Sequence, residues 1–254
     1  MNTVKIRNIT LGNGIPKICL PIIGRTLNEI TQQAKNIIAN PVDIVEWRAD
    51  WFEYYKDIDE SNNAIDAIRE IIKDIPLLYT IRTKNEGGEA DADFDEYSAI
   101  LNKISTNPDI DAADVEILLS SSDNIQDLIG TLKKNCVVIA SSHDFAKTPC
   151  RNEIIDRLKY MEKCGADVCK MAVMPNSPDD VLTLLSATND AHALINRPLI
   201  TMSMGKWGLI SRLSGELFGS SLTFGCVGNA SAPGQIEADE LNTVLQIIHK
   251  NGYY

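Results

Sequence analysis

Short segments typical of buried β-strands alternate with amphipathic segments typical of helices along the whole chain. The strand-like segments are rich in branched apolar side chains, and each is followed by a helical stretch before the next one begins. This order predicts parallel strands joined by helical crossovers. The strands are expected at residues 18–24, 43–48, 77–83, 112–117, 136–141, 167–173, 198–204 and 222–227.

A (β/α)8 barrel has eight strands that are each followed by a helix, which is the number predicted here, and 254 residues is a typical length for that fold. We therefore predict an α/β protein with one domain, a TIM barrel over residues 1–254. The alternative is an open doubly wound sheet, which usually carries a glycine-rich fingerprint after its first strand, and residues 24–27 lack one. The helices are expected at 27–38, 64–73, 96–104, 125–134, 153–163, 178–188, 209–217 and 236–249.

A β-hairpin is expected before the barrel. Residues 3–9 and 15–20 flank Gly12-Asn13-Gly14, which is typical of a tight turn. The second strand would continue into the barrel, so the hairpin would close the bottom of the barrel.

The charge of the chain restricts its partners. A formal net charge of −11 and a pI near 4.8 disfavour nucleic acids and anionic membranes, but not a small anionic substrate held by local arginines. No apolar run has the length of a membrane span, and the N-terminus lacks the apolar core of a signal peptide. The six cysteines form no Cys-x-x-Cys pair, which favours a cytoplasmic protein.

The strand expected at 167–173 carries Lys170 in the middle of an apolar run. An isolated ammonium group is costly in an apolar interior, where the neutral amine is favoured. A neutral lysine in a pocket attacks carbonyl carbon and forms a Schiff base. The alternative is a lysine that extends from the end of the strand to solvent.

Other strands also place polar side chains on their inward face, close to their carboxyl ends. Because successive strand residues point to opposite faces, the inward set can be read from parity and consists of Glu46, Arg48, Arg82, His143, Met202 and Met204. Each has a simpler explanation: Glu46 and Arg48 could form a structural ion pair, and Met202 could fill the core. Together they indicate an active site, since a barrel interior is normally apolar and barrel enzymes react at the carboxyl ends of the strands.

The loops that follow the strands add further candidates. Glu86-Gly87-Gly88 follows the third strand, where glycines allow close approach of a ligand to the backbone. Arg212 follows the seventh strand, and Ser231 to Gln235, after the eighth, has the turn-forming composition of a lid. A metal site is not expected, because the chain has only three histidines and no tight carboxylate cluster.

This set of residues fits carbonyl chemistry. Lys170 would form an iminium that acidifies the adjacent C–H group, and His143 would take that proton and return it to a leaving hydroxyl. A carboxylate should orient the imidazole, and an arginine should hold a substrate carboxylate.

The ordered motifs resemble those of the type I 3-dehydroquinases, the Schiff-base enzymes of the shikimate pathway, over nearly the whole chain. Each motif is weak alone, but the ordered set is specific. The matching stretches are Glu46-Trp47-Arg48-Ala49-Asp50, Arg82-Thr83 with Glu86-Gly87-Gly88-Glu89, Asp114-Val115-Glu116, Ser142-His143-Asp144-Phe145, Lys170-Met171-Ala172-Val173-Met174-Pro175, Thr201-Met202-Ser203-Met204-Gly205, Ser211-Arg212-Leu213, Phe218-Gly219-Ser220 and Ser231-Ala232-Pro233-Gly234-Gln235-Ile236.

The resemblance implies reversible dehydration of 3-dehydroquinate to 3-dehydroshikimate by a lyase that needs no metal or cofactor and is commonly a homodimer. Lys170 would form the Schiff base with the C3 ketone, His143 would remove the C2 proton and assist loss of the C1 hydroxyl, and Glu86 would orient His143. Arg212 would bind the substrate carboxylate. The rest of the substrate site would comprise Glu46, Arg48 and Arg82 at the ring hydroxyls, Ser231 and Gln235 in the lid, and Met202 and Phe224 as apolar walls.

One position departs from the family pattern, and two other functions stay open at this stage. Pro21 stands where some family members have serine, so it offers no hydroxyl to a substrate. A class I aldolase on the same barrel would also use a Schiff-base lysine, although such enzymes often bind phosphate after strands seven and eight. A barrel that only binds a ligand is the third possibility, and it would not need the complete set of Lys170, His143 and Glu86.

Overall fold

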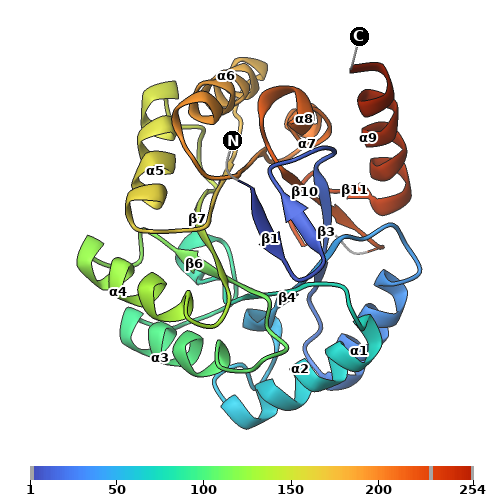
Figure 1. Cartoon of the computed structure of the whole chain (residues 1–254), viewed down its shortest axis with the longest axis vertical. Helices are drawn as coiled ribbons and strands as arrows, with labels where there is room; N and C mark the ends of the chain where they lie inside the picture. The colour runs from blue at the N-terminus through green and yellow to red at the C-terminus, as the bar shows by residue number, and fades with distance from the viewer. Residues whose placement is uncertain (1–2, 229–230, 253–254) are drawn as a thin grey trace.

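The structure, a computed structural model, describes residues 3–228 and 231–252. A barrel of parallel strands lies at its centre, and helices surround it (Figure 1). The strands are neighbours in the order β10-β3-β4-β5-β6-β7-β8-β9, and the bridge Leu199–Ser220 closes the ring between β9 and β10. The predicted (β/α)8 barrel is therefore confirmed. Its strands are β3 (Lys17–Ile22), β4 (Ile44–Arg48), β5 (Leu77–Thr80), β6 (Ala112–Glu116), β7 (Val137–Asp144), β8 (Val168–Val173), β9 (Leu199–Ser203) and β10 (Leu222–Cys226).

The helices pack their apolar faces against the outside of the barrel. Most begin at a side chain that accepts a backbone N–H, as Thr26, Asp93 and Ser177 do for α1, α3 and α6. The helical segments are α1 (Leu27–Ile37), η1 (Ala49–Trp51), α2 (Ile58–Ile72), η2 (Lys84–Glu86), α3 (Phe94–Ile104), α4 (Ser122–Leu132), α5 (Arg151–Lys163), α6 (Pro178–Leu194), α7 (Leu209–Leu213), α8 (Gly215–Phe218) and α9 (Ala238–Gly252).

Some helix boundaries differ from the predicted ones. Helix α2 begins six residues before the predicted start at 64, because the Asp57 side chain accepts the N–H groups of Asp59 and Glu60. The predicted helix at 209–217 is divided into α7 and α8 at Ser214. The predicted helix at 236–249 begins with the short strand β11 (Ile236–Glu237), which pairs with β10 before α9 starts.

On β4 to β8 the interior of the barrel changes from apolar to polar along the strand, whereas the inward side chains of β9 and β10 stay apolar. At the amino end of the strands the inward side chains are all apolar and form the barrel floor. They include Ile44, Leu78, Ile139 and Val168. Two residues further along the same strands, the inward positions are polar, as at Lys170 on β8. Since side chains alternate faces, a shift of two residues stays inside the barrel and moves one layer toward the carboxyl ends. Chemistry is thereby confined to one end.

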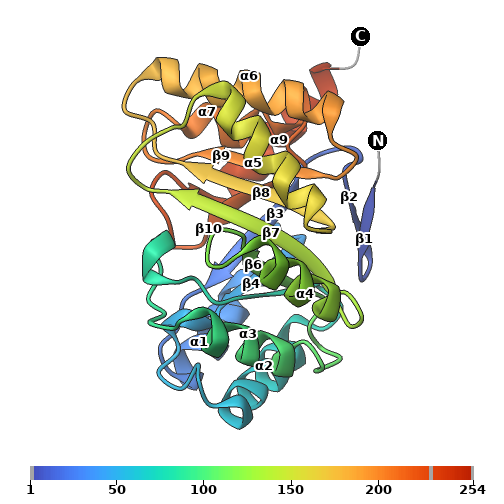
Figure 2. The ribbon, with the colours of Figure 1, turned by 90° about the vertical axis from the view of Figure 1, so that its left-hand side faces the viewer.

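The N-terminal hairpin covers the other end of the barrel, as Figure 2 shows at the tails of the strand arrows. It consists of β1 (Val4–Ile6) and β2 (Ile9–Leu11), and the fully buried Ile6 and Leu11 pack into the apolar floor. The predicted position of the turn was wrong. The chain reverses at Arg7 and Asn8, so the predicted 3–9 and 15–20 pairing does not form, and residues 12–16 connect the hairpin to β3.

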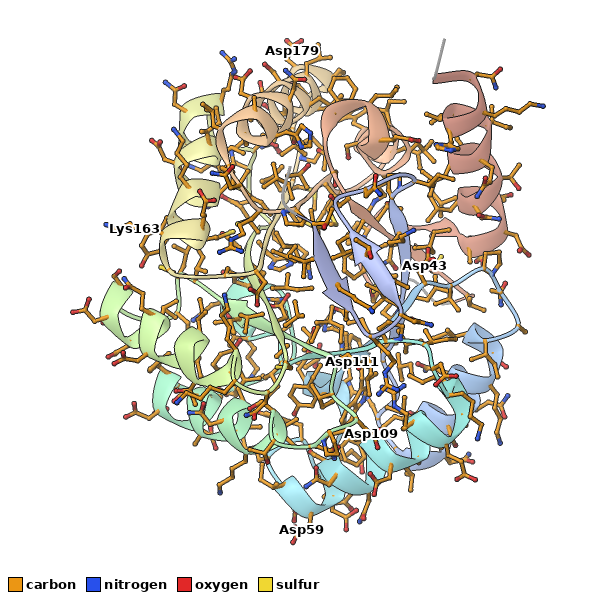
Figure 3. All side chains as sticks on the ribbon, in the orientation of Figure 1. Asp43, Asp59, Asp109, Asp111, Lys163 and Asp179 are labelled. Carbon is orange, nitrogen blue, oxygen red and sulfur yellow. The ribbon has the colours of Figure 1, made fainter. Side chains whose placement is uncertain are left out.

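Ion pairs attach the hairpin to the barrel. Arg7 Nε lies 2.8 Å from Asp111 Oδ1, and Asp111 Oδ2 also pairs with Arg69 Nη2 at 2.8 Å. Figure 3 labels Asp109 and Asp111 below the hairpin in that view. These contacts give the barrel floor a polar rim far from the charged end. Within the described part of the chain, no helix is both long and apolar enough to span a membrane.

Candidate active site

A cavity of about 220 Å³ opens at the carboxyl end of the barrel. All eleven residues that the sequence predicts for the site line it, although they come from the five strands β4, β7, β8, β9 and β10 and from four loops or short helices. The lining residues are Glu46, Arg48, Arg82, Glu86, Gly87, His143, Phe145, Lys170, Ala172, Met202, Met204, Arg212, Phe224, Ser231, Ala232, Pro233 and Gln235.

Lys170 lies on β8 and is 3% exposed, so it does not extend to solvent. Its Nζ lies 3.1 Å from Asp114 Oδ2 and 3.8 Å from Glu46 Oε1, and 4.7 Å from the centre of the Phe224 ring. The expectation of an isolated charge in apolar surroundings, which rested on the strand at 167–173 alone, is wrong. The nitrogen lies instead between two carboxylates and an aromatic wall.

Asp114, on β6, is the site residue that the sequence argument did not select. It is completely buried, and its Oδ1 accepts hydrogen bonds from Ser141 Oγ at 2.6 Å and Arg82 Nη2 at 2.7 Å. Burial would raise the pKa of Asp114, but Arg82 and Lys170 outweigh it and hold the pKa below its usual range. The signal was present in the sequence, because Asp114 shares the inward parity of Ala112.

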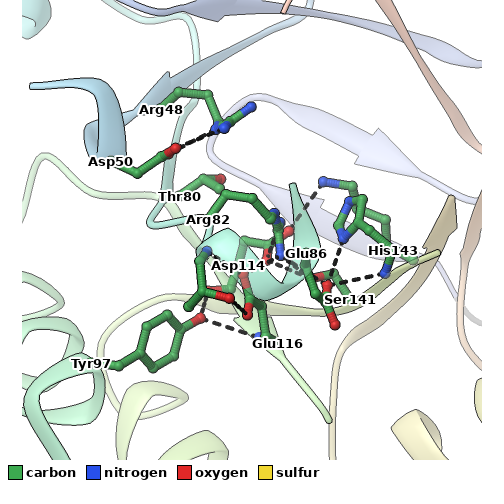
Figure 4. A network of polar contacts seen from close by, with 12 residues as sticks. Arg48, Asp50, Thr80, Arg82, Glu86, Tyr97, Asp114, Glu116, Ser141 and His143 are labelled. Carbon is green, nitrogen blue, oxygen red and sulfur yellow. Dashed lines mark hydrogen bonds and ion pairs between the residues drawn. The ribbon is translucent and has the colours of Figure 1, made fainter. Parts of the chain in front are cut away.

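Arg82 follows β5 and binds three carboxylates at the end of the barrel (Figure 4). Besides Asp114, its Nη1 donates to Glu116 Oε1 at 3.0 Å and lies 3.4 Å from Glu86 Oε2. Burial lowers the pKa of Arg82, but these carboxylates outweigh burial and raise it well above its ordinary value. Arg82 is therefore a fully neutralised cation at the centre of an acidic network.

Glu86 and His143 form the second reactive pair. Oε2 of Glu86 accepts the backbone N–H of His143 at 3.0 Å and lies 2.8 Å from His143 Nδ1. Burial raises the pKa of Glu86 to about 8 against the opposing charge of Arg82, and burial together with Arg82 and Lys170 lowers the pKa of His143 well below its usual value. The imidazole is thereby kept neutral, and its Nδ1 is fixed by Glu86, as a general base requires.

The loop that carries Glu86 is held by a glycine. Gly87 ends η2 with a left-handed φ of 79°, and a Cβ atom there would approach the Phe145 ring to 2.4 Å. The ring of Phe145, which also lines the cavity, therefore packs directly on the backbone next to Glu86.

Glu46 and Arg48 do not pair with each other, so their interpretation as one structural ion pair is wrong. Arg48 makes a bidentate pair with Asp50, at 2.8 Å from Nε and 2.7 Å from Nη2, within the network of Figure 4. Glu46 accepts a hydrogen bond from Thr80 Oγ1 at 3.0 Å. Both side chains are buried and contribute to the cavity wall.

Arg212, on α7, has a different environment from Arg82. It is 1% exposed, and among the described residues no carboxylate pairs with it. Its guanidinium contacts Met202 Sδ at 3.7 Å and the carbonyl oxygens of Phe224 and Pro233 at 3.5 and 3.1 Å. Burial lowers the pKa of Arg212 to about 10, so it remains a buried cation without a counter-ion. Such a group is a receptor for an anion.

The expected lid packs over the cavity beside Arg212. Ser231 and Gln235 bond to each other twice: Gln235 Oε1 accepts the Ser231 N–H at 2.8 Å, and Gln235 Nε2 donates to Ser231 Oγ at 3.0 Å. Between them, the Pro233 carbonyl accepts the Gly205 N–H at 3.1 Å as well as the Arg212 contact. The position of the lid is therefore linked to that of Arg212.

Pro21 does not line this cavity. It lines a separate one of about 230 Å³ beside α1, together with Gln33, Asn36 and Val227. Among the described residues, no group of three or more histidine, cysteine or carboxylate side chains could hold a metal ion.

This site is typical of Schiff-base enzymes. At the carboxyl end of a barrel it combines a buried lysine, a neutral histidine that a carboxylate orients, and an unpaired arginine. The chain belongs to the type I 3-dehydroquinase family, whose model matches residues 18–252. The predicted resemblance is thereby confirmed, and the chain is a lyase of the Schiff-base class. The aldolase and the non-catalytic barrel are set aside.

Relatives match along nearly their whole length. The 3-dehydroquinate dehydratases of Listeria monocytogenes serotype 4b (strain F2365) and Clostridioides difficile (strain 630) are each 46% identical over 251 residues, which cover 98% of this chain and 99% and 98% of theirs. The crystal structure of the type I enzyme from Clostridium difficile with covalently modified comenic acid has a TM-score of 0.94 at 46% identity, covering 98% of both chains. The crystal structure of the 3-dehydroquinate dehydratase from Geobacillus kaustophilus HTA426 has a TM-score of 0.95 at 36% identity. The match covers 98% of this chain and 97% of that one.

Proposed function

We propose that this chain eliminates water from 3-dehydroquinate to give 3-dehydroshikimate, reversibly, through a Schiff base on Lys170. The observation that carries the proposal is one cavity of about 220 Å³ that joins Lys170, the Glu86–His143 pair and the unpaired Arg212. The substrate has one ketone, one carboxylate and several hydroxyls, which match a nucleophilic nitrogen, a free guanidinium and polar walls, respectively.

Capture of the ketone is the first step. Lys170 begins as an ammonium, and a lone pair becomes available on nitrogen when one proton leaves. The lone pair forms the bond to C3, and the carbonyl oxygen departs as water with the two protons that nitrogen has lost in total. The product is a protonated imine, so the single positive charge remains on nitrogen.

His143 then performs the proton transfers. Its free ring nitrogen takes a proton from C2, and the C–H electrons form a C2–C3 double bond while the imine electrons move to nitrogen. When the nitrogen lone pair re-forms the imine, the electrons of the C2–C3 double bond form a C1–C2 double bond and the C1–O bond breaks. The imidazolium gives its proton to the departing hydroxyl, which leaves as a second water. Glu86, 2.8 Å from Nδ1, orients the ring and stabilises its charged form. Hydrolysis of the imine releases the enone and restores Lys170.

The other lining residues bind and enclose the substrate. Arg212 holds the carboxylate, and Glu46, Arg48 and Arg82 contact the ring hydroxyls and shape the field. Met202 and Phe224 form the apolar wall beside Lys170. Ser231 and Gln235 close over the ring, supported by the contact between Pro233 and Arg212.

Borohydride trapping tests the proposal directly. Reduction in the presence of 3-dehydroquinate should attach the ligand to Lys170, and mass spectrometry of the peptides should locate it there. Lys170→Ala should abolish turnover in an ultraviolet assay for the enone, whereas His143→Ala should lose turnover but still be trapped. Lys84→Ala, which removes an exposed lysine paired with Asp91, is the matched control and should change neither readout. Labelling at another lysine would overturn the assignment.

We also propose that residues 1–254 form one domain that works as a homodimer in the cytoplasm without metal or cofactor. All six cysteines are free, which supports a reducing compartment. Light scattering should give twice the chain mass of 28.0 kDa. Activity should survive dialysis against a chelator.

A further inference from the structure

Asp114 is the nearest partner of Lys170, yet it does not line the cavity. Its carboxylate is completely buried below the layer that substrate can reach, with Oδ2 at 3.1 Å from the lysine nitrogen. Glu46 is the next carboxylate, at 3.8 Å. A group in this position acts on the substrate through its partners, and Lys170 is the one of them that forms the Schiff base.

The Asp114 carboxylate is fixed by donors from three different strands or strand ends. Oδ1 accepts from Ser141 Oγ on β7 at 2.6 Å and from Arg82 Nη2 after β5 at 2.7 Å, which leaves Oδ2 for Lys170 on β8. Ser141 and Lys170 are also direct partners in the register of β7 and β8. Two of these donors thus hold the oxygen that faces away from the lysine and determine where the other one lies.

We propose that Asp114 is the positioning residue of Lys170 and its permanent counter-ion through the reaction. This inference rests on the proposed function, since it concerns the nitrogen that forms the Schiff base. Asp114 directs Nζ into the cavity and away from the barrel floor. Because it remains ionised and hydrogen-bonded, it does not exchange protons with the substrate.

The charge balance of the first step explains why a permanent anion is useful there. An ammonium and a ketone give a protonated imine and water, so one positive charge lies on nitrogen before and after the step. A counter-ion already in place needs no rearrangement as the bond forms. The proton that leaves C2 goes to His143, so Asp114 retains its charge during elimination too.

The test is the rate at which borohydride traps the imine in a single turnover. Asp114→Asn keeps the shape of the side chain but removes its charge, and it should slow imine formation about 100-fold, the effect of a misplaced reacting group. Glu116→Gln is the matched control: it also removes one carboxylate from Arg82, at 3.0 Å, but none from Lys170. It should slow trapping less than about 5-fold. Equal losses in the two variants, or none in Asp114→Asn, would overturn the inference.

A second pair of variants decides the question if Asp114→Asn does not fold. Ser141→Ala removes the 2.6 Å hydrogen bond that holds Asp114, together with the 3.0 Å hydrogen bond that Ser141 Oγ accepts from Arg82 Nη1, and should slow trapping about 5-fold. Ser142→Ala, the next residue on β7, removes a hydroxyl without a partner in the described structure and should have no effect. Equal rates for these two variants would contradict the inference. Failure of the unmodified protein to be trapped at Lys170 would instead contradict the proposed function.

Discussion

Arg82 and Arg212 lie on opposite sides of the same cavity and are equally buried, at 3% and 1% exposure, but their neighbours differ. Arg82, on the side formed by β4 to β7, pairs with three carboxylates. Arg212, on the side formed by β9 and β10, contacts only a thioether and two carbonyl oxygens. The three carboxylates raise the pKa of Arg82, although burial opposes this. Burial lowers the pKa of Arg212 to about 10.

The difference separates the two tasks of the cavity. The acidic side satisfies its own charges and holds Lys170 and His143 in place, so it is complete without a ligand. The other side contains an uncompensated cation that an anionic substrate would neutralise. Net charge alone does not show this division, because the whole chain carries −11.

The largest effect is expected from removing the cation of the acidic side. Arg82→Met should lower the free energy of unfolding by about 3–5 kcal/mol, since three buried carboxylates lose a shared partner. Denaturant unfolding measures the change. Arg25→Met, at a side chain that is 56% exposed and 3.7 Å from Glu89, is the control and should change stability by less than about 0.5 kcal/mol. If Arg82→Met lowered the unfolding free energy by less than about 1 kcal/mol, the proposed difference between the two sides of the cavity would be wrong.

The same substitution on the other side should affect binding rather than folding. Arg212→Met should raise the KM for substrate about 100-fold, because a charge-assisted contact with the substrate carboxylate is lost. Stability should stay equal or increase, since a buried cation without a counter-ion is costly to the native state. Steady-state kinetics and unfolding of the same preparation check both parts. A loss of stability as large as that of Arg82→Met would show that Arg212 has a structural role.

Glu86→Gln should reduce kcat about 10-fold, because an amide stabilises the imidazolium less well than a carboxylate does. KM and trapping at Lys170 should be nearly unchanged. The variant should also alter the pH dependence of stability. Because the native pKa of Glu86 is raised to about 8, its protonated form stabilises the folded state at low pH, and this contribution is lost as pH rises through 8.

As the pH rises from 6 to 9, the unfolding free energy of Glu86→Gln should therefore increase relative to that of the unmodified protein. Denaturant curves at the two pH values measure it. The opposite trend would show that Glu86 is ionised throughout this range.

A smaller effect on stability than that of Arg82→Met is expected at the loop beside Glu86. Gly87→Ala should cost about 1–3 kcal/mol, since it combines a left-handed φ of 79° with a clash against the Phe145 ring. Gly14→Ala is a matched control with a φ of 70° and no atom within 4 Å of the added Cβ. The difference in unfolding free energy between the two variants isolates the packing of Phe145. Equal costs would mean that this packing does not hold the loop.

Local pattern predicted much of the site. Strand parity placed Glu46, Arg48, Arg82, His143 and Lys170 inside the barrel, because inward positions repeat every second residue. Residues in loops, such as Glu86 and Gln235, have no such period, and their roles came from the family resemblance. Asp114 had the correct parity but was not selected, since the sequence did not show that Lys170 needs a partner.

The error in the predicted hairpin turn has a local cause. The glycines at 12 and 14 suggested the hairpin turn, but the two-residue turn at Arg7 and Asn8 allows both Ile6 and Leu11 to reach the barrel floor. Burial of these side chains outweighed the turn preference of glycine.

By itself, the sequence determined the number of barrel strands, their alternation with helices and, for β4 to β8, the layer at which the inward side chains change from apolar to polar. Only the tertiary structure decided which charges meet: that Arg48 pairs with Asp50 and not Glu46, that Lys170 has Asp114, and that Arg212 has no acidic partner in the described structure. The physical reason is the closure of the barrel, which brings together side chains from strands far apart in the chain. Their electrostatic energies depend on distances of a few ångströms that no local pattern specifies.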